Sequence, residues 1–193
     1  MVFLLKYSTT KMAYIHKLES YPNGQVKLER VFFSDDEFSY EENEYLDNGN
    51  IKNKKIFKYY CFIKEIIYYA YKPEQIFQIY EHDLNRTNYV MYYDNGHIET
   101  KGQFEDRKQV GEWIWYYQNG QITTVRKFNN GVKNGIQIFY RENGLIAYEG
   151  MIVDGKNEGE WIWYDIKGQI TCKRIYVAHV LKSEWLAENN PDK

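Results

Sequence analysis

The side chains able to perform acid–base, nucleophilic or metal chemistry are scattered along this 193-residue chain. Cys61 and Cys172 are far apart, which matches neither a zinc pattern nor a disulfide framework. No HExxH, GxSxG, P-loop or GxGxxG motif occurs. We therefore expect no metal, no cofactor and no catalytic residue. The four histidines are isolated from one another: His16, His82, His97 and His179.

Two carboxylates recur at equal positions and deserve a test as an acid–base pair. Glu112 and Glu160 each precede a tryptophan in a repeated Gly-Glu-Trp string. If they lie two hairpins apart, four strand spacings of about 4.8 Å separate them by roughly 19 Å. Paired carboxylate catalysis needs a much shorter separation. The spacing favours binding over catalysis.

Tryptophan and arginine give the better candidate site. Trp113 and Arg126 recur as Trp161 and Arg174, and the hairpins predicted below place each arginine opposite its tryptophan. The intervening repeat pairs Gln137 with a glycine instead. One interpretation is packing: the arginine stacks on the indole, and the glycine leaves room for the side chain of a neighbouring strand. The other is a periodic row of aromatic–arginine sites that bind a partner.

An acidic run over residues 35–47 is the second candidate, and lysines follow it at once. Glu41, Glu42 and Glu44 are its central members. One interpretation is a solvated hairpin with Glu42 facing Lys55, in which each exposed ion pair contributes little. The alternative is that residues 35–44 form an acidic loop that meets a basic partner.

A 24-residue repeat must position these side chains. Such a period is typical of repeat architectures, whose units stack because none buries its apolar face alone. The same turn recurs more weakly toward the N-terminus, with Glu74 in the glycine position after Pro73. The predicted seven turns lie at Gly24, Gly49, Glu74, Gly96, Gly120, Gly144 and Gly168.

Asn-Gly between alternating residues predicts a hairpin, because both central residues of a type I′ turn need positive φ. With Asn119-Gly120 as that turn, Tyr117 faces Ile122 and Trp113 faces Arg126. Residues 129–135 then form the loop at the opposite end, with two glycines as turn residues.

The predicted fold is all-β, an elongated antiparallel meander of about seven hairpins in one twisted, curved sheet. We expect a single repeat domain made of an N-terminal cap strand (1–19), degenerate repeats (20–88), regular repeats (89–176) and a C-terminal cap with tail (177–193). Tyrosine-rich composition agrees, with 20 tyrosines and 18% aromatic residues. Near Trp185 we favour a strand and a frayed tail, although Ser183 could instead cap a short helix.

The net charge and the hydropathy of the chain limit the classes of partner that we expect. The net charge of −2 gives no basic field for nucleic acid. No run of about 20 apolar residues exists, and the N-terminus has no leader pattern. We therefore expect a cytoplasmic protein without stable membrane insertion, as a monomer or weak homo-oligomer.

The strings GEWIWYYQNGQI, FNNGVKNG and GEWIWYD resemble the MORN-repeat variant family, of the kind found in bacterial YwqK-type antitoxins. The resemblance is close over residues 89–170. It implies a non-catalytic immunity-type protein that neutralises a cognate toxic effector by direct binding. Two alternatives stay open: a scaffold or membrane-associated interaction module, and a glycan binder that stacks sugars on its tryptophans.

Overall fold

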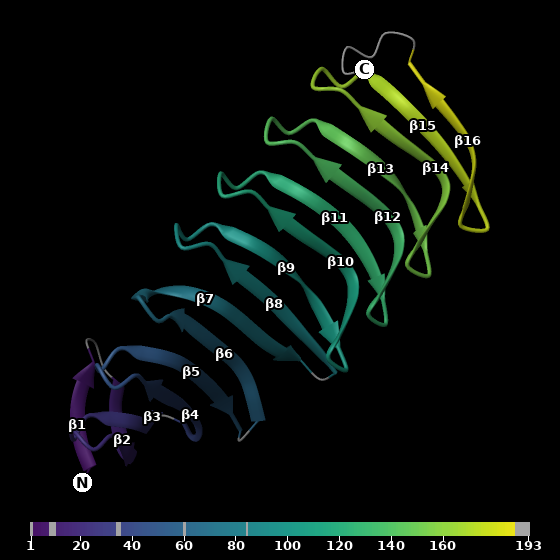
Figure 1. The fold of residues 1–193 in the computed structure, drawn as a ribbon. Coiled ribbons are helices and arrows are strands. Elements are labelled where there is room, and N and C mark those ends of the chain that lie inside the picture. The colour runs from purple at the N-terminus through teal and green to yellow at the C-terminus, as the bar shows by residue number, and fades with distance from the viewer. Residues whose placement is uncertain (1, 8–10, 34–35, 60, 84, 188–193) are drawn as a thin grey trace. The chain divides into compact units, whose positions relative to one another are not determined.

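The computed structural model describes residues 2–7, 11–33, 36–59, 61–83 and 85–187 (Figure 1). All regular structure in these ranges is β-strand, and the strands pair antiparallel in chain order without a crossover. The predicted all-β hairpin meander is confirmed. The chain forms two compact units, residues 1–96 and 97–193, and each is described by itself.

The first unit holds strands β1 to β8, each paired with the next along the chain. β-branched and aromatic residues, which favour strands, occur in every one of them. The strands are β1 (Val2–Tyr7), β2 (Lys11–Ser20), β3 (Val26–Phe33), β4 (Asp36–Tyr45), β5 (Ile51–Lys58), β6 (Cys61–Tyr69), β7 (Lys72–Asp83) and β8 (Arg86–Tyr92).

The second unit holds strands β9 to β16, again paired in chain order. It contains most of the buried apolar side chains of the described chain. The strands are β9 (Ile98–Glu105), β10 (Lys108–Tyr116), β11 (Ile122–Asn129), β12 (Val132–Tyr140), β13 (Ile146–Val153), β14 (Lys156–Tyr164), β15 (Ile170–Val177) and β16 (Val180–Leu186).

The Asn-Gly turns predicted from the 24-residue repeat are hairpin turns, but not of the predicted type I′. Tyr117 N–H donates to Gln121 O at 2.8 Å and Gly120 N–H donates to Tyr117 O at 2.9 Å. Gly120 is left-handed, with φ of 84°, whereas Asn119 is not. This is a three-residue loop with glycine in the left-handed position. The predicted two-residue turn is wrong, because asparagine acts through its side chain.

That side chain accepts a backbone hydrogen bond two residues on. Asn119 Oδ1 accepts from Gln121 N–H at 3.0 Å, and Asn23, Asn48 and Asn143 make the same contact in their turns. Where Lys167 replaces asparagine, Asp165 Oδ1 accepts from both Lys167 and Gln169 N–H at 2.8 Å. An Asx-type bond therefore survives the substitution.

Type I′ geometry occurs at the opposite ends of the hairpins. Asn130 and Gly131 have φ of 51° and 83°, and they join β11 to β12 as a two-residue turn. Asp154 and Gly155 do the same between β13 and β14. Gly135, predicted as part of this loop, instead lies within β12 beside a register shift.

The turn predicted at Glu74 is also misplaced. Tyr69 pairs with Lys72 across a two-residue turn, and Glu74 lies inside β7. Two register shifts in the β6–β7 pair absorb the extra residues around Pro73. Proline thus occupies an irregular part of the strand, where no ladder hydrogen bond is lost.

A second contact with the 24-residue spacing ties neighbouring hairpins together. Tyr117 Oη donates to Tyr140 O at 2.9 Å, and Tyr21 Oη donates to Tyr45 O at 2.9 Å. In the next repeat Arg141 Nη2 takes this role toward Tyr164 O at 2.7 Å. The first residue of each of these turns therefore satisfies a backbone carbonyl of the following hairpin.

The C-terminal segment is strand β16, which confirms the favoured alternative over a helix starting at Ser183. Its predicted frayed tail lies outside the described residues, as does Asp35 of the acidic run.

Candidate functional site

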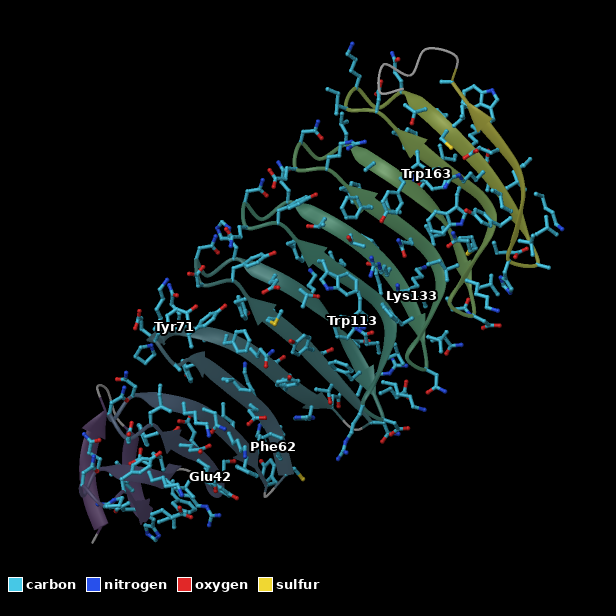
Figure 2. The ribbon with its side chains drawn as sticks, in the orientation of Figure 1. Glu42, Phe62, Tyr71, Trp113, Lys133 and Trp163 are labelled. Carbon is cyan, nitrogen blue, oxygen red and sulfur yellow. The ribbon has the colours of Figure 1, made fainter. Side chains whose placement is uncertain are left out.

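One face of the second unit collects the tryptophans and arginines predicted as a site, and we call it the tryptophan face (Figure 2). The predicted register is present: Trp113 pairs with Arg126 and Trp161 pairs with Arg174. A bulge between Trp115 and Tyr116 restores this register although the turn differs from the prediction. Because side chains alternate along strands, Trp115 and Trp163 lie on the same face.

Trp113 and Trp161 are packing residues. They are only 2% and 4% exposed, and each indole Nε1 donates to a backbone carbonyl, of Gln103 at 3.1 Å and of Met151 at 3.0 Å. Each indole also lies against a glycine, as the packing interpretation requires. A methyl group at Gly150 would lie 2.2 Å from Trp161 Cδ2. These two rings are unavailable as stacking platforms for a sugar.

Gly102 repeats this arrangement under Trp113, where an added Cβ would also lie 2.2 Å from the indole. Neither glycine has a positive φ. Their role is therefore steric, because only a residue without Cβ leaves room for the ring.

The arginines stack on the second tryptophan of each repeat. Arg126 Cζ lies 5.3 Å from the Trp115 ring centroid, and Arg174 Cζ lies 4.9 Å from that of Trp163. Both distances fit a cation–π contact. Each arginine therefore stacks on the tryptophan that is diagonal to it, Trp115 or Trp163. The tryptophan directly opposite, Trp113 or Trp161, is buried.

The two arginines differ in their charge partners. Arg174 Nε lies 2.6 Å from Glu184 Oε1, so its charge is neutralised within the unit. Arg126 faces Gln137 at the corresponding place on the next strand, and it makes no ion pair within the described part of the chain. Its Nε is buried without a hydrogen-bond partner. Because Gln137 stands where Arg174 has Glu184, the charge of Arg126 is not neutralised there and can bind an anionic group.

An aromatic ladder lines the tryptophan face. Phe139 and Tyr148 stack with ring centroids 5.1 Å apart and an interplanar angle of 3°. Tyr148 continues to Trp161 and Trp163 at 6.3 and 6.4 Å. Cross-strand aromatic pairs of this kind stabilise the sheet and limit side-chain motion.

The acidic candidates lie on a strand of the first unit. Glu41, Glu42 and Glu44 belong to β4, so the acidic-loop alternative for residues 35–44 is wrong over its described part (Figure 2). Alternation places Glu41 on the face opposite to the other two. Each carboxylate has its own cation: Glu41 pairs with Lys54 at 2.8 Å, Glu42 with Arg30 at 3.1 Å and Glu44 with Lys52 at 2.7 Å.

The predicted register of Glu42 opposite Lys55 is present, but the ion pair forms on the other side, with β3. The sequence pairing identified one neighbour of β4, whereas a central strand has two. Glu41, Glu42 and Glu44 are therefore each neutralised within the unit.

A second aromatic ladder in the first unit was missed from the sequence. Tyr40 and Phe57 stack at 4.6 Å with an angle of 12°, and the contacts continue on both sides. One aromatic or histidine per strand, placed near the hairpin ends, is the pattern that could have revealed it. The ladder comprises His16, Phe32, Tyr40, Phe57, Phe62 and His82.

Tyr164 and Cys172 are among the ionisable groups of the second unit whose pKa is shifted. Burial, followed by the hydrogen bond to Glu149 at 2.7 Å, raises the pKa of Tyr164 to about 12. Burial also raises the pKa of the Cys172 thiol. Both shifts favour the neutral form, so neither group is activated as a base or nucleophile. His97 contacts Gln118 O at 2.6 Å through Nδ1.

No group of three or more histidine, cysteine, aspartate or glutamate side chains is arranged to hold a metal ion among the described residues. Within those same ranges, no helix is long and apolar enough to cross a membrane.

Comparison with known families gives one match. The family described as MORN repeat variant matches residues 88–106 and 109–130, which contain Trp113, Trp115 and Arg126. A search of curated proteins finds no match. Over these two stretches the chain is similar to the MORN repeat variant, a family that is generally a non-enzymatic repeat module serving interaction.

Proposed function

We propose that the chain is a non-catalytic protein-binding module. Arg126, on its tryptophan face, binds an acidic side chain of the partner. The observation that supports this is the contrast between equivalent repeat positions. Arg174 is neutralised by Glu184 at 2.6 Å, whereas Arg126 faces the neutral Gln137. The unit therefore contains one arginine that is stacked, held and not ion-paired.

The surroundings of Arg126 suit a protein partner. Trp115 holds the guanidinium from one side, so little side-chain entropy is lost when it binds. Tryptophan, tyrosine and arginine are the residues that most often anchor interfaces. A planar guanidinium can bind a carboxylate through two parallel hydrogen bonds, which gives both strength and orientation.

The finer proposal is that the partner is a toxic effector, neutralised by direct binding in the manner of an immunity protein or antitoxin. It rests on the resemblance of the repeats to YwqK-type antitoxins. The sequence had pointed to Glu41, Glu42 and Glu44 as partner-binding residues, but these carboxylates already pair with cations of the same unit. We therefore propose Arg126 as the residue that binds the partner.

Co-expression tests this proposal. A candidate toxin from the same genome is induced in cells with wild-type chain, Arg126→Gln or Lys127→Gln. Lys127 is the matched control, because it is exposed and its side chain points to the opposite face. We expect protection by the wild type and by Lys127→Gln, and loss of protection with Arg126→Gln. Equal protection by all three proteins would remove Arg126 from the binding surface.

A purified complex separates the two levels of the proposal. Binding of a non-toxic protein that depends on Arg126 would retain the interaction module and eliminate the antitoxin role. Recovery of anionic liposomes at physiological salt instead of a protein would favour the membrane-associated alternative.

A further inference from the structure

Lys133 is a second cation on the tryptophan face, and it belongs to the same hairpin as Arg126. It lies directly opposite Phe128, whose ring contacts both Trp113 and Trp115, so its side chain shares their face (Figure 2). Lys133 is half-buried, and within the described part of the chain it makes no ion pair. The hairpin of β11 and β12 therefore presents two cations on one face.

Within the described residues of the second unit, no other hairpin combines two such cations. The residues at 24-residue spacing from Lys133 also lie opposite side chains of the tryptophan face, but they are uncharged: Gln109, Asn157 and Leu181. Those at the same spacing from Arg126 are Gly102, Gly150 and Arg174. Since Arg174 is already paired with Glu184, the two unneutralised charges are a feature of this hairpin and not of the repeat.

The chain places no carboxylate of its own beside these two cations within its described part. The sequence from Trp113 to Arg141 contains neither aspartate nor glutamate. Asp154, in the turn next to Lys133, accepts a hydrogen bond from Asn134 Nδ2 at 3.2 Å instead. The carboxylates in the strands from β9 to β15 lie on the opposite face by alternation: Glu99, Glu105, Glu112, Glu149, Glu158 and Glu160. The two cations are therefore available to acidic groups from outside the chain.

The two cations are held apart across β11. Arg126 stacks at 5.3 Å on Trp115, which belongs to β10, whereas Lys133 belongs to β12 on the other side. Because Lys133 is opposite Phe128, two residues after Arg126, the two Cβ atoms are about 7–8 Å apart, as in a diagonal pair. This arrangement suits two separate anionic groups better than one group shared by both cations.

We propose that Arg126 and Lys133 bind two carboxylates of the partner that are two residues apart on an extended segment. Residues i and i+2 of a strand point to the same side and lie about 6.6–6.8 Å apart, which is close to the spacing of the two cations. Neighbours on a helix face are closer, at about 5–6 Å. This inference rests on the function proposed above, to which it adds a second binding residue and a partner motif with alternate acidic residues.

Peptide titration of the full chain tests this motif. The probes are three synthetic peptides that differ only in a central triplet: Glu-Ser-Glu, Glu-Ser-Gln and Gln-phosphoserine-Gln. The NMR resonance of the Arg126 Nε–H reports binding, because this group is buried without a hydrogen-bond partner and its shift responds to a carboxylate at the guanidinium. We expect the peptide with two glutamates to bind about three- to fivefold more tightly than that with one, the effect of one added, partly exposed charge pair.

Variants of Lys133 assign the second carboxylate. Lys133→Gln should remove the preference for two glutamates. Lys127→Gln is the matched control, because it removes the same charge from the opposite face of the same hairpin and should leave the preference unchanged. Lys133→Glu should reverse the preference, so that a peptide with the triplet Glu-Ser-Lys binds more tightly than Glu-Ser-Glu. Thermal unfolding by circular dichroism establishes that each variant is folded.

Three outcomes would overturn the proposal. The first is an Arg126 resonance that does not shift, or that shows equal affinity for one and for two glutamates. The second is tightest binding of the phosphoserine peptide, which indicates that the cations share one dianion. The third is a preference for two glutamates that Lys133→Gln leaves intact. In each case the co-expression test with Arg126→Gln still decides the function proposed above by itself.

Discussion

Gly150→Ala tests whether the tryptophans are fixed by the strand beside them. The added Cβ would lie 2.2, 2.4 and 2.5 Å from Cδ2, Cε2 and Cγ of Trp161. Carbon atoms at favourable contact are about 3.5–4.0 Å apart. The indole must therefore move by more than 1 Å. It is 4% exposed and confined by Tyr148 and Trp163, with its Nε1 bonded to Met151 O.

The cost follows from these constraints. Overpacking a filled site destabilises by about 1–3 kcal/mol. Displacing the indole also loses a hydrogen bond, at about 0.5–1.5 kcal/mol. Alanine recovers about 0.5–1 kcal/mol because it reduces the chain entropy of the unfolded state. We expect Gly150→Ala to lower the free energy of unfolding by about 2–3 kcal/mol.

Urea unfolding followed by circular dichroism measures this change, provided the slope with denaturant is unchanged. The matched control is the double-mutant cycle with Trp161→Leu, in which the smaller side chain should make Gly150→Ala neutral or stabilising. Gly102→Ala should behave like Gly150→Ala, because its Cβ meets Trp113 at the same 2.2 Å. A change within about 0.5 kcal/mol, the range of ordinary surface substitutions, would refute the packing role.

Three further predictions concern single groups. The pKa of Tyr164 is higher in the folded protein than in the unfolded chain, so the stabilising effect of Tyr164 is present below pH 10 and lost as the pH rises toward about 12. Tyr164→Phe should therefore make the free energy of unfolding less pH-dependent in that range. An unchanged alkaline profile would contradict this. Cys61 is exposed while burial raises the pKa of Cys172, so a thiol reagent should label Cys61 first and Cys172 only on unfolding, as peptide mass analysis would show. Asp165→Ala should lower the thermal midpoint and Lys167→Asn should restore it, because asparagine returns the lost backbone acceptor; no rescue would mean that the two turns are not equivalent.

The sequence predicted the strand class and much of the register, for a physical reason. A 24-residue period with glycine at each turn permits little except hairpins in series, and alternation then fixes which side chains share a face. Trp113 opposite Arg126 and Trp161 opposite Arg174 are confirmed for that reason. The glycines beneath the indoles also follow from this pairing.

The turn type, the ion-pair partners and the difference between the two arginines could not be predicted, because they depend on residues outside the single hairpin that the sequence pattern defines. Asn119-Gly120 is compatible with both turn types, and a bulge at Trp115/Tyr116 compensates the difference. Glu42 pairs with Arg30 on its other neighbour strand, which the hairpin alone could not indicate. The distinction between Arg126 and Arg174 depends on the strand that follows each, and Glu184 lies in the predicted C-terminal cap.

The affinity of a purified partner for three matched proteins tests the central claim most directly. Isothermal titration with wild type, Arg126→Gln and Lys127→Gln compares the same loss of charge on opposite faces. Losing a hydrogen bond to a charged group costs about 1.5–3 kcal/mol, which is roughly 10- to 150-fold in the dissociation constant. We predict this loss for Arg126→Gln and a change below about twofold for Lys127→Gln. Equal affinities, or the larger loss at Lys127, would contradict binding through the tryptophan face.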